Sequence, residues 1–201
     1  MTENKTYIHD FCSIENNEIV VNGISVFKSE PTDFTGFSKQ AYRHFEISYP
    51  KFFKMDALSK LAFLGSELLL KNQDNQDTAL VFANKSSSLD TDFKHQETIA
   101  DKVNYYPSPA VFVYTLPNIC LGEISIRHQL KSENSFFIFD TFNTQFMSDY
   151  ATILLHTQKA TKVLCGWVEF FKDDYKAFLC IISLQENDKF QNETINTLYN
   201  K

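Results

Sequence analysis

Short apolar runs separated by polar turns make up much of this chain. Residues 78–83 (TALVFA), 162–171 (KVLCGWVEFF) and 175–186 (YKAFLCIISLQE) are apolar along most of their length. Such runs are typical of strands that are covered on both faces of a sheet. Residues 19–27 form two further runs around an Asn-Gly dipeptide, which predicts a hairpin because both residues tolerate a positive φ.

Two other segments have the spacing of helices. Between residues 55 and 69, apolar or small residues recur with a helical period of about 3.6. Asp56 stands where it would cap the start of this helix. Residues 119–130 predict a second helix, with Asn118 as its cap and basic residues near its C-terminal end, where positive charge is favoured.

The remaining segments predict little regular structure. We expect an irregular stretch over residues 31–50, a Ser-rich loop over 84–93 and an extended stretch between the prolines of 105–118. The polar tail over residues 187–201 is expected to be a frayed helix or disordered. Because strands and helices alternate, residues 1–201 predict a single mixed α/β domain, a sheet flanked by helices.

The stretch SENSFFIFDTFNTQFMSDYATILL (residues 132–155) joins an apolar strand to a helix through a polar turn. In many enzymes such a turn presents a nucleophile, but this one reads DTFNT (residues 140–144). The residues FFIF (136–139) are apolar on both sides of the strand, so we expect both of its faces to be covered.

Composition and charge exclude several classes of function. The chain has 201 residues, 43% of them hydrophobic, which is enough for one domain with a sizeable core. A net charge of −6 without any run of Lys and Arg argues against a nucleic-acid groove. The N-terminus lacks the pattern of a signal peptide, and no apolar run reaches the roughly 18 residues of a membrane span. We therefore expect a cytoplasmic protein without a membrane span.

No local motif predicts a metal or cofactor site. The four cysteines form no CxxC pair and are expected to be buried thiols. His95 and Glu97 come nearest to a metal pair, but residues i and i+2 do not share a helix face. No GxSxG elbow surrounds a serine, and Asp173-Asp174 is expected to be a solvated turn between strands.

Several segments, read in order, resemble the N-terminal half of the β-ketoacyl synthases, the condensing enzymes of fatty-acid and polyketide assembly. Residues 54–70 (KMDALSKLAFLGSELLL) are similar to an early helix of that family, and residues 163–171 (VLCGWVEFF) to one of its strands. The block YPSPAVFVYTLPNICLGEISIRHQLKSEN (residues 106–134) is the specific part of a resemblance that covers about residues 50–185. It is strongest to the short ketosynthase-like subunits of aryl polyene and flexirubin-type pathways. The resemblance implies half of a thiolase-like layered fold.

The resemblance places Thr141 where the family holds its nucleophilic cysteine. Counting forward from Ser132 and counting back from Gly166 lead to the same residue. A threonine hydroxyl lacks an accessible thiolate and would need a general base. The family's catalytic histidines and lysine, which stabilise the enolate formed on decarboxylation, come from a C-terminal half that this sequence does not include. The resemblance therefore implies a subunit without condensing activity and without a cofactor.

A subunit of this kind would act as a partner. The resemblance implies a chain-length-factor-like protein that forms a heterodimer with a full-length β-ketoacyl synthase, and contact with an acyl carrier protein is left open. In the family, the strand before the cysteine pairs across a two-fold axis. The corresponding interface residues here are Ser135, Phe136, Phe137, Ile138, Phe139, Asp140 and Thr141.

Four large side chains follow that strand at helix-compatible spacing: Phe142, Phe146, Met147 and Tyr150. By analogy with chain-length factors, they would wall or close a tunnel for the growing acyl chain, because adding bulk to a filled cavity is costly. The alternative is that they only fill the core of this subunit.

Two other functions stay open at this point. One is a small hydrolase or acyltransferase that binds an acyl thioester and uses Thr141 or a serine among residues 86–88. The other is a self-associating binding module, in which the Phe-rich strand pairs with the same strand of a second copy.

Overall fold

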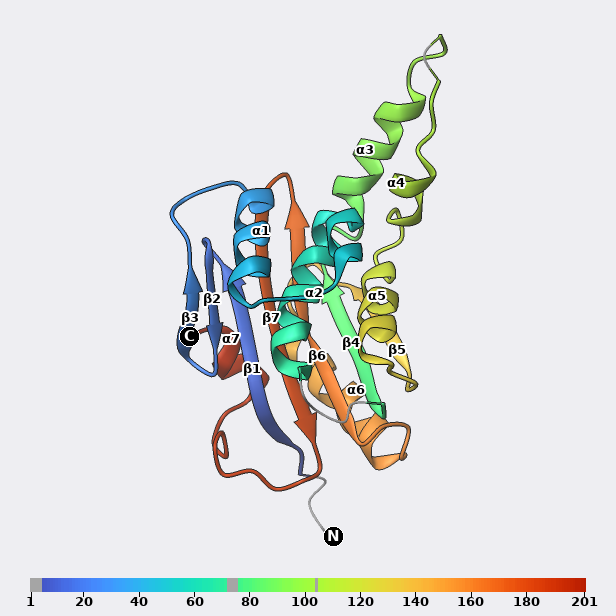
Figure 1. Ribbon diagram of the computed structural model, residues 1–201. Coiled ribbons are helices and arrows are strands. Elements are labelled where there is room, and N and C mark those ends of the chain that lie inside the picture. The colour runs from blue at the N-terminus through green and yellow to red at the C-terminus, as the bar shows by residue number, and fades with distance from the viewer. Residues whose placement is uncertain (1–4, 72–75, 104) are drawn as a thin grey trace.

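A computed structural model describes residues 5–71, 76–103 and 105–201 of the chain. It consists of one mixed seven-stranded sheet with helices on both faces (Figure 1). The strands are β1 (Tyr7–Glu15), β2 (Glu18–Val21), β3 (Ile24–Lys28), β4 (Thr78–Asn84), β5 (Asn134–Ile138), β6 (Lys162–Phe171) and β7 (Asp174–Ser183). The helices are α1 (Phe34–His44), the 3-10 helix η1 (Pro50–Lys54), α2 (Ala57–Leu70), α3 (Leu89–Ile99), α4 (Pro109–Val113), α5 (Ile119–His128), α6 (Thr144–His156) and α7 (Ile195–Tyr199).

The order of the strands across the sheet is β3-β2-β1-β7-β6-β4-β5. Strand β4 runs parallel to β5 and β6, and the other neighbouring pairs are antiparallel. Gly166 on β6 allows β7 to come close, because a Cβ atom at this position would lie 1.9 Å from the carbonyl oxygen of Phe178. The first and last strands of this order, β3 and β5, form the two edges of the sheet.

Two apolar layers fill the space between the sheet and its helices. The layer under α1, α2 and α5 is rich in aromatic rings, and Phe52, Phe63 and Phe82 in it are fully buried. The layer on the other face lies under α6 and α7, where Met147 and Ile195 are buried. Both faces of the central strands are therefore covered, as the apolar runs of β4, β6 and β7 predicted.

The strongest local predictions are confirmed. The Asn-Gly dipeptide turns β2 into β3, with φ of 54° at Asn22 and 82° at Gly23. The Asp56 side chain accepts a 2.9 Å hydrogen bond from the amide of Ser59 and caps α2. Asn118 occupies the N-cap position of α5 as expected, although its side chain makes no capping hydrogen bond.

The prediction of an irregular stretch over residues 31–50 is wrong, because α1 lies within it. The Asp33 side chain caps this helix by accepting a 2.7 Å hydrogen bond from the amide of Gly36. Phe34, Phe37 and Ala41 then fall on one buried face of the helix. Pro31 and Pro50 lie outside α1, so they do not break it, and burial of the apolar face stabilises the helix.

Three more segments are more helical than the sequence indicated. The Ser-rich loop ends at Ser88, where α3 begins, and α4 interrupts the stretch that was expected to be extended. Pro109 stands in the first turn of α4, where a missing amide donor costs nothing. The polar tail ends in α7, whose capping box joins Thr194 and Thr197 and whose inner side chains are buried, so this helix is not frayed.

Candidate functional site

Strand β5 is an apolar edge of the sheet. It pairs with β4 alone among the strands that the structure describes, with Asn134 opposite Leu80 and Ile138 opposite Asn84. The backbone groups on its outer side are therefore available to another strand. In Figure 1, β5 lies at the right-hand margin of the sheet, beside α5.

The side chains of β5 point alternately into the two apolar layers. Phe136 packs against the layer of α2 and α5, while Phe137 and Phe139 pack against the other layer. The ring of Phe146 on α6 lies 4.8 Å from that of Phe137 and 5.1 Å from that of Phe139, centroid to centroid. The predicted covering of both faces is confirmed for these rings, whereas Ile138 is 49% exposed.

Nothing within β5 protects this edge. Natural edge strands commonly carry a lysine, a proline or a bulge that prevents another strand from adding to them. The sequence NSFFI (Asn134–Ile138) has no lysine or proline, and its pairing with β4 is continuous. The edge is therefore suited to pairing with a further strand.

The turn after β5 leads directly into α6. The Asn143 side chain caps this helix by accepting a 3.0 Å hydrogen bond from the amide of Phe146. Thr141 is exposed in the turn, beside a shallow hollow of about 370 Å³ that residues 139–145 line. Among the described residues, none makes a hydrogen bond with the Thr141 hydroxyl.

Within the described part of the chain, the histidines make their contacts away from the turn at Thr141. The Nε2 atom of His9 is hydrogen-bonded to the hydroxyl of Ser183 at 2.8 Å, and Nε2 of His128 lies 3.1 Å from a carboxylate oxygen of Glu67. The rings of His44 and His95 pack against phenylalanines. His156 ends α6, so it is roughly 20 Å along the helix from the turn.

The cysteines cannot take over the role of a nucleophile. Cys12, Cys120, Cys165 and Cys180 are all free and buried, as predicted. Burial raises the pKa of the Cys12 thiol to about 12 and that of Cys120 well above its ordinary value. A hydrogen bond with Cys165, together with burial, raises the pKa of Cys180. The thiols of Cys12, Cys120 and Cys180 are therefore protonated near neutral pH, whereas a thiolate is the nucleophilic form.

The amide of Ser86 and the hydroxyl of Ser88 have structural roles. The side chain of Glu169 accepts hydrogen bonds from the amides of Lys85 (2.6 Å) and Ser86 (3.2 Å), so these donors are already occupied. The hydroxyl of buried Ser88 donates to the carbonyl oxygen of Thr115 at 2.6 Å. This arrangement gives no support to the hydrolase alternative at this loop.

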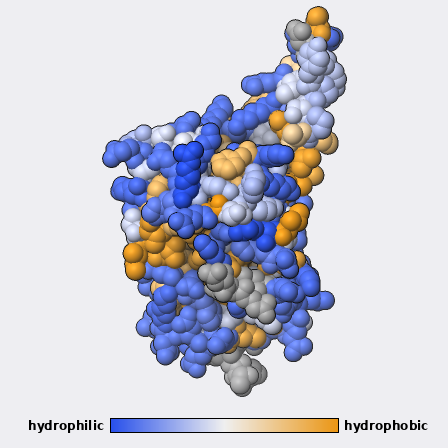
Figure 2. Space-filling view, in the orientation of Figure 1, coloured by the Kyte–Doolittle hydropathy of each residue, from blue (hydrophilic) through white to orange (hydrophobic). Residues whose placement is uncertain are grey.

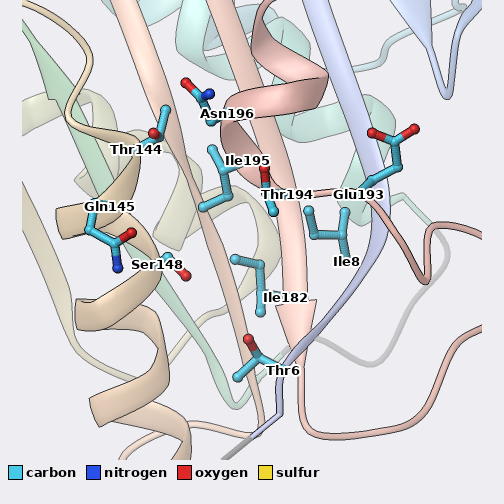
Figure 3. Close-up of a pocket in the computed structure, with 10 residues that line it drawn as sticks. All are labelled: Thr6, Ile8, Thr144, Gln145, Ser148, Ile182, Glu193, Thr194, Ile195 and Asn196. Carbon is cyan, nitrogen blue, oxygen red and sulfur yellow. The ribbon is translucent and has the colours of Figure 1, made fainter.

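A separate hollow of about 260 Å³ lies between the start of α6, α7 and the ends of β1 and β7 (Figure 3). Ile8, Ile182 and Ile195 form its apolar part, and the other lining side chains are hydroxyls, amides and Glu193. The Glu193 carboxylate is paired with Lys201 and accepts a 2.7 Å hydrogen bond from Thr197. The hollow therefore lacks the pair of groups that nucleophilic catalysis requires.

Neither a metal-binding cluster nor a membrane-spanning helix is found among the residues that the structure describes. Within residues 5–71, 76–103 and 105–201, no three His, Cys, Asp or Glu side chains are grouped so that they could hold a metal ion. No helix among these residues combines the length and apolar character needed to cross a membrane.

Comparisons with known proteins identify the fold. No family profile and no curated protein matches the sequence. Among solved structures, the ishigamide ketosynthase/chain length factor is similar, with a TM-score of 0.67 and 16% identity over 89% of this chain and 62% of that one. The ketosynthase ApeO in complex with its chain length factor ApeC, from Xenorhabdus doucetiae, has a TM-score of 0.60 and 18% identity over 90% of this chain and 80% of that one. A β-ketoacyl synthase from Burkholderia phymatum has a TM-score of 0.57 and 12% identity over 89% of this chain and 59% of that one.

The chain has a ketosynthase-like fold. The expected thiolase-like layered α/β domain is thereby confirmed, although the chain spans less than two thirds of the matched chains in two of these structures. Within the ketosynthase-like fold, β5 and the turn at Thr141 are the features that the sequence resemblance singled out.

The four side chains considered for a tunnel occupy different environments in this ketosynthase-like fold. Met147 is fully buried, and the ring of Phe142 packs within 5.6 Å of Trp167. The rings of Phe146 and Tyr150 both lie against Phe137 of β5. All four contact the layer beneath α6, and their role in a tunnel stays a prediction.

Sequence reasoning missed a buried ionic cluster that fixes α5 beside β5. Glu67 on α2 accepts hydrogen bonds of 2.6 and 3.0 Å from the guanidinium of Arg127, and His128 lies 3.1 Å away. Burial acts to raise the pKa of Glu67, but the hydrogen bonds and charges of His128 and Arg127 outweigh it and lower the pKa to about 2. The only sequence signal was a glutamate on an otherwise apolar helix, because a buried charge requires a partner.

Proposed function

We propose that this chain is a non-catalytic ketosynthase-like subunit that pairs with a full-length β-ketoacyl synthase through β5. The free, Phe-rich edge of β5 is the observation that carries the proposal. It is supported by the ketosynthase-like fold, since two of the similar structures are described as a ketosynthase with a chain length factor. The pairing segment is Ser135, Phe136, Phe137, Ile138, Phe139, Asp140 and Thr141.

The absence of catalysis is part of the proposal. Thr141 occupies the turn in which the resemblance expects a cysteine, and no described residue is hydrogen-bonded to its hydroxyl. A hydroxyl without a base is a poor nucleophile, so a covalent acyl intermediate at this turn is disfavoured. The role left to the subunit is to bind and shape the partner.

The charge at the ends of β5 favours a different chain over a second copy as the partner. Suppose that β5 paired antiparallel with β5 of a second copy, with Phe136 opposite Phe136. Glu133 of each copy would then lie opposite Phe139 of the other copy, one position from that copy's Asp140. Residues 132–141 include no basic side chain that could offset these carboxylates. Like charges close together across paired strands are destabilising, so a partner with basic residues at these places fits better.

The specific setting that we propose is a cytoplasmic complex that makes polyketide or polyene chains, with aryl polyene and flexirubin-type pathways as the nearest resemblance. Phe142, Phe146, Met147 and Tyr150 would then help to set the length of the acyl tunnel in the complex. One similar structure is described as a type II polyketide synthase acyl-carrier protein in complex with its ketosynthase. Contact between this subunit and an acyl carrier protein is included in the proposal on that basis.

Co-expression tests the proposal directly. The tagged chain is produced together with each full-length β-ketoacyl synthase of the same genome, and the mass of the purified species is measured by light scattering. We expect a one-to-one complex with one synthase that persists at micromolar concentration, because an obligate interface buries more than about 2,000 Å². Separate elution from every synthase, or a homodimer that an added synthase does not change, would contradict the proposal.

A further inference from the structure

The hollow of about 260 Å³ between α6 and α7 has an aliphatic floor. Ile8 near the start of β1, Ile182 near the end of β7 and Ile195 at the start of α7 form this floor, and all three are buried. Figure 3 shows the three isoleucines between the two helices. On the other face of the sheet, the surface over α1 and α2 is largely hydrophilic (Figure 2). The hollow thus offers a ligand an apolar surface that helices enclose on two sides.

Three hydroxyl groups line this hollow without a protein partner. Thr6 precedes β1, whereas Thr144 and Ser148 lie on the first two turns of α6. None of their hydroxyls is hydrogen-bonded to another residue in the part of the chain that the structure describes. A hydroxyl both donates and accepts, so these three groups can bond a ligand that lies on the isoleucines.

Other polar side chains of the lining already have partners. The side-chain amide of Gln145 donates to Asp149 at 2.8 Å, on the outer side of α6. Among the described residues that line the hollow, Glu193 alone is charged, and its carboxylate is paired with Lys201. An anion would be repelled by Glu193, and a cation would have to displace Lys201. The lining therefore favours a ligand without charge.

Both helices that border the hollow are fixed at the ends that contact it. Asn143 caps α6 through the amide of Phe146, and a capping box of Thr194 and Thr197 starts α7. Leu198 of α7 is buried in the apolar layer beneath the two helices. The walls are therefore preformed, and a ligand does not have to order them, which lowers the cost of binding.

The hollow adjoins the shallow one beside Thr141. Thr144 and Gln145 line both of them. A chain-shaped ligand on the isoleucine floor thus has room to extend along the start of α6 toward the turn at Thr141.

We infer that this hollow binds a small neutral aliphatic molecule that carries hydroxyl or amide groups. The aliphatic part lies on the three isoleucines, and the polar groups bond the hydroxyls of Thr6, Thr144 and Ser148. The volume equals that of about nine water molecules, so a ligand of roughly eight to twelve non-hydrogen atoms fits. A purely apolar chain is disfavoured, because it would leave the three hydroxyls without partners. This inference goes beyond the pairing through β5 and does not depend on it.

Methyl NMR of the isoleucines tests the inference with 1,2-hexanediol and N-butylacetamide as probes. The sample is the full chain, or its purified complex with a synthase where co-expression is needed for soluble protein. Both probes should give saturable shifts of the methyl signals of Ile8, Ile182 and Ile195, with no change at exposed Ile24 and Ile153. Hexanoate and hexylammonium should bind at least tenfold more weakly. No shift of the three floor signals, equal shifts at all five isoleucines, or equal affinity for the charged probes would overturn the inference.

Variants of the lining locate the site. Ser148→Leu fills the hollow and should weaken the binding of 1,2-hexanediol at least 20-fold, whereas Thr144→Val keeps the shape, removes one hydroxyl and should weaken it at least threefold. Thr157→Val is the matched control, because Thr157 follows α6 at its other end and its hydroxyl is bonded to the carbonyl oxygen of Ile153. Its affinity should stay within twofold of wild type. Wild-type affinity in both lining variants, or an equal loss in the control, would place the probe elsewhere and overturn the inference.

Discussion

The two edges of the sheet are built in opposite ways. At the β3 edge, the register with β2 shifts between Ile19 and Val20, and an exposed ion pair joins Lys28 to Glu18. At the β5 edge, the register is continuous and the strand offers only uncharged side chains. Irregularity and charge discourage the addition of another strand. One sheet thus has a closed edge and an open edge, and the open edge alone is suited to a partner.

The ion pairs near the two edges also differ, because those beside β5 are buried and the one at β3 is on the surface. The helix beside β5 is held by buried charges, in which Glu67 is 2% exposed. The ion pair of the β3 edge is on the surface, where such pairs contribute little. The open edge therefore has the more rigid support, and four predictions test this difference.

The largest expected effect is on stability at the β5 side. Glu67→Ala removes the carboxylate and leaves Arg127 and His128 without their partner, which should lower the free energy of unfolding by about 3 kcal/mol or more. The measurement is urea denaturation followed by circular dichroism. Glu18→Ala is the control at the β3 edge, and its midpoint should stay close to that of wild type. Equal losses in the two variants would contradict the contrast between the edges.

The next effect is on pairing itself. Ile138→Lys places a charge on the open edge and should weaken binding to the synthase at least 100-fold, about 2.7 kcal/mol. Ile24→Lys is the matched change on the closed edge, where Ile24 is 68% exposed, and should alter affinity less than twofold. Both dissociation constants can be measured by titration of the purified subunits. A loss of binding in both variants would show that the edges do not differ in this function.

A smaller effect follows from pH. Because the folded-state pKa of Glu67 is about 2, below its ordinary value of 4.5, its ionisation stabilises the fold above pH 4.5. This contribution is lost as the pH falls from 4.5 toward 2. In denaturation at a series of pH values, the difference between wild type and Glu67→Gln should shrink over this window. A difference that is independent of pH would show that the charge of Glu67 has no role in stability.

The smallest expected effect concerns the closed edge. Gly23→Ala forces a side chain into the positive φ of the β2–β3 turn, although a Cβ atom would meet nothing within 4 Å. The cost is therefore only that of the backbone, about 1 kcal/mol. Thermal unfolding should detect this loss, and affinity for the synthase should not change. Weaker binding would indicate that the β3 edge also contacts the partner.

Local patterns predicted much of the sheet but not its edges. The apolar runs of β4, β6 and β7 and the turn at Asn22 could be predicted, because burial and turn chemistry act over a few residues. The order of the strands depends on contacts between distant segments, so no local pattern indicated that β5 is an edge. Helix α4 was missed because its prolines favour an extended chain, although Pro109 is in a position that a helix tolerates.

The candidate site, like the sheet, could be predicted only in part from the sequence. The strand before Thr141 was expected from its own residues, and the role of Thr141 came only from the resemblance to the synthases. The contact of Arg127 with Glu67 joins residues 60 positions apart, which no periodicity can reveal.

The position of β1 between β2 and β7 has a consequence for synthesis in the cell. Tyr7 lies opposite Ser183 and Glu15 opposite Lys176, so β1 cannot complete its pairing until β7 has left the ribosome. At typical rates of translation, the hairpin of β1 and β2 would wait roughly 10–30 s for that strand. During this interval the nascent chain exposes unpaired strands to its neighbours, and long-range pairing of this kind folds slowly. Simultaneous synthesis with a partner that takes up β5 would remove one of these exposed strands, which should be visible as a higher soluble yield on co-expression.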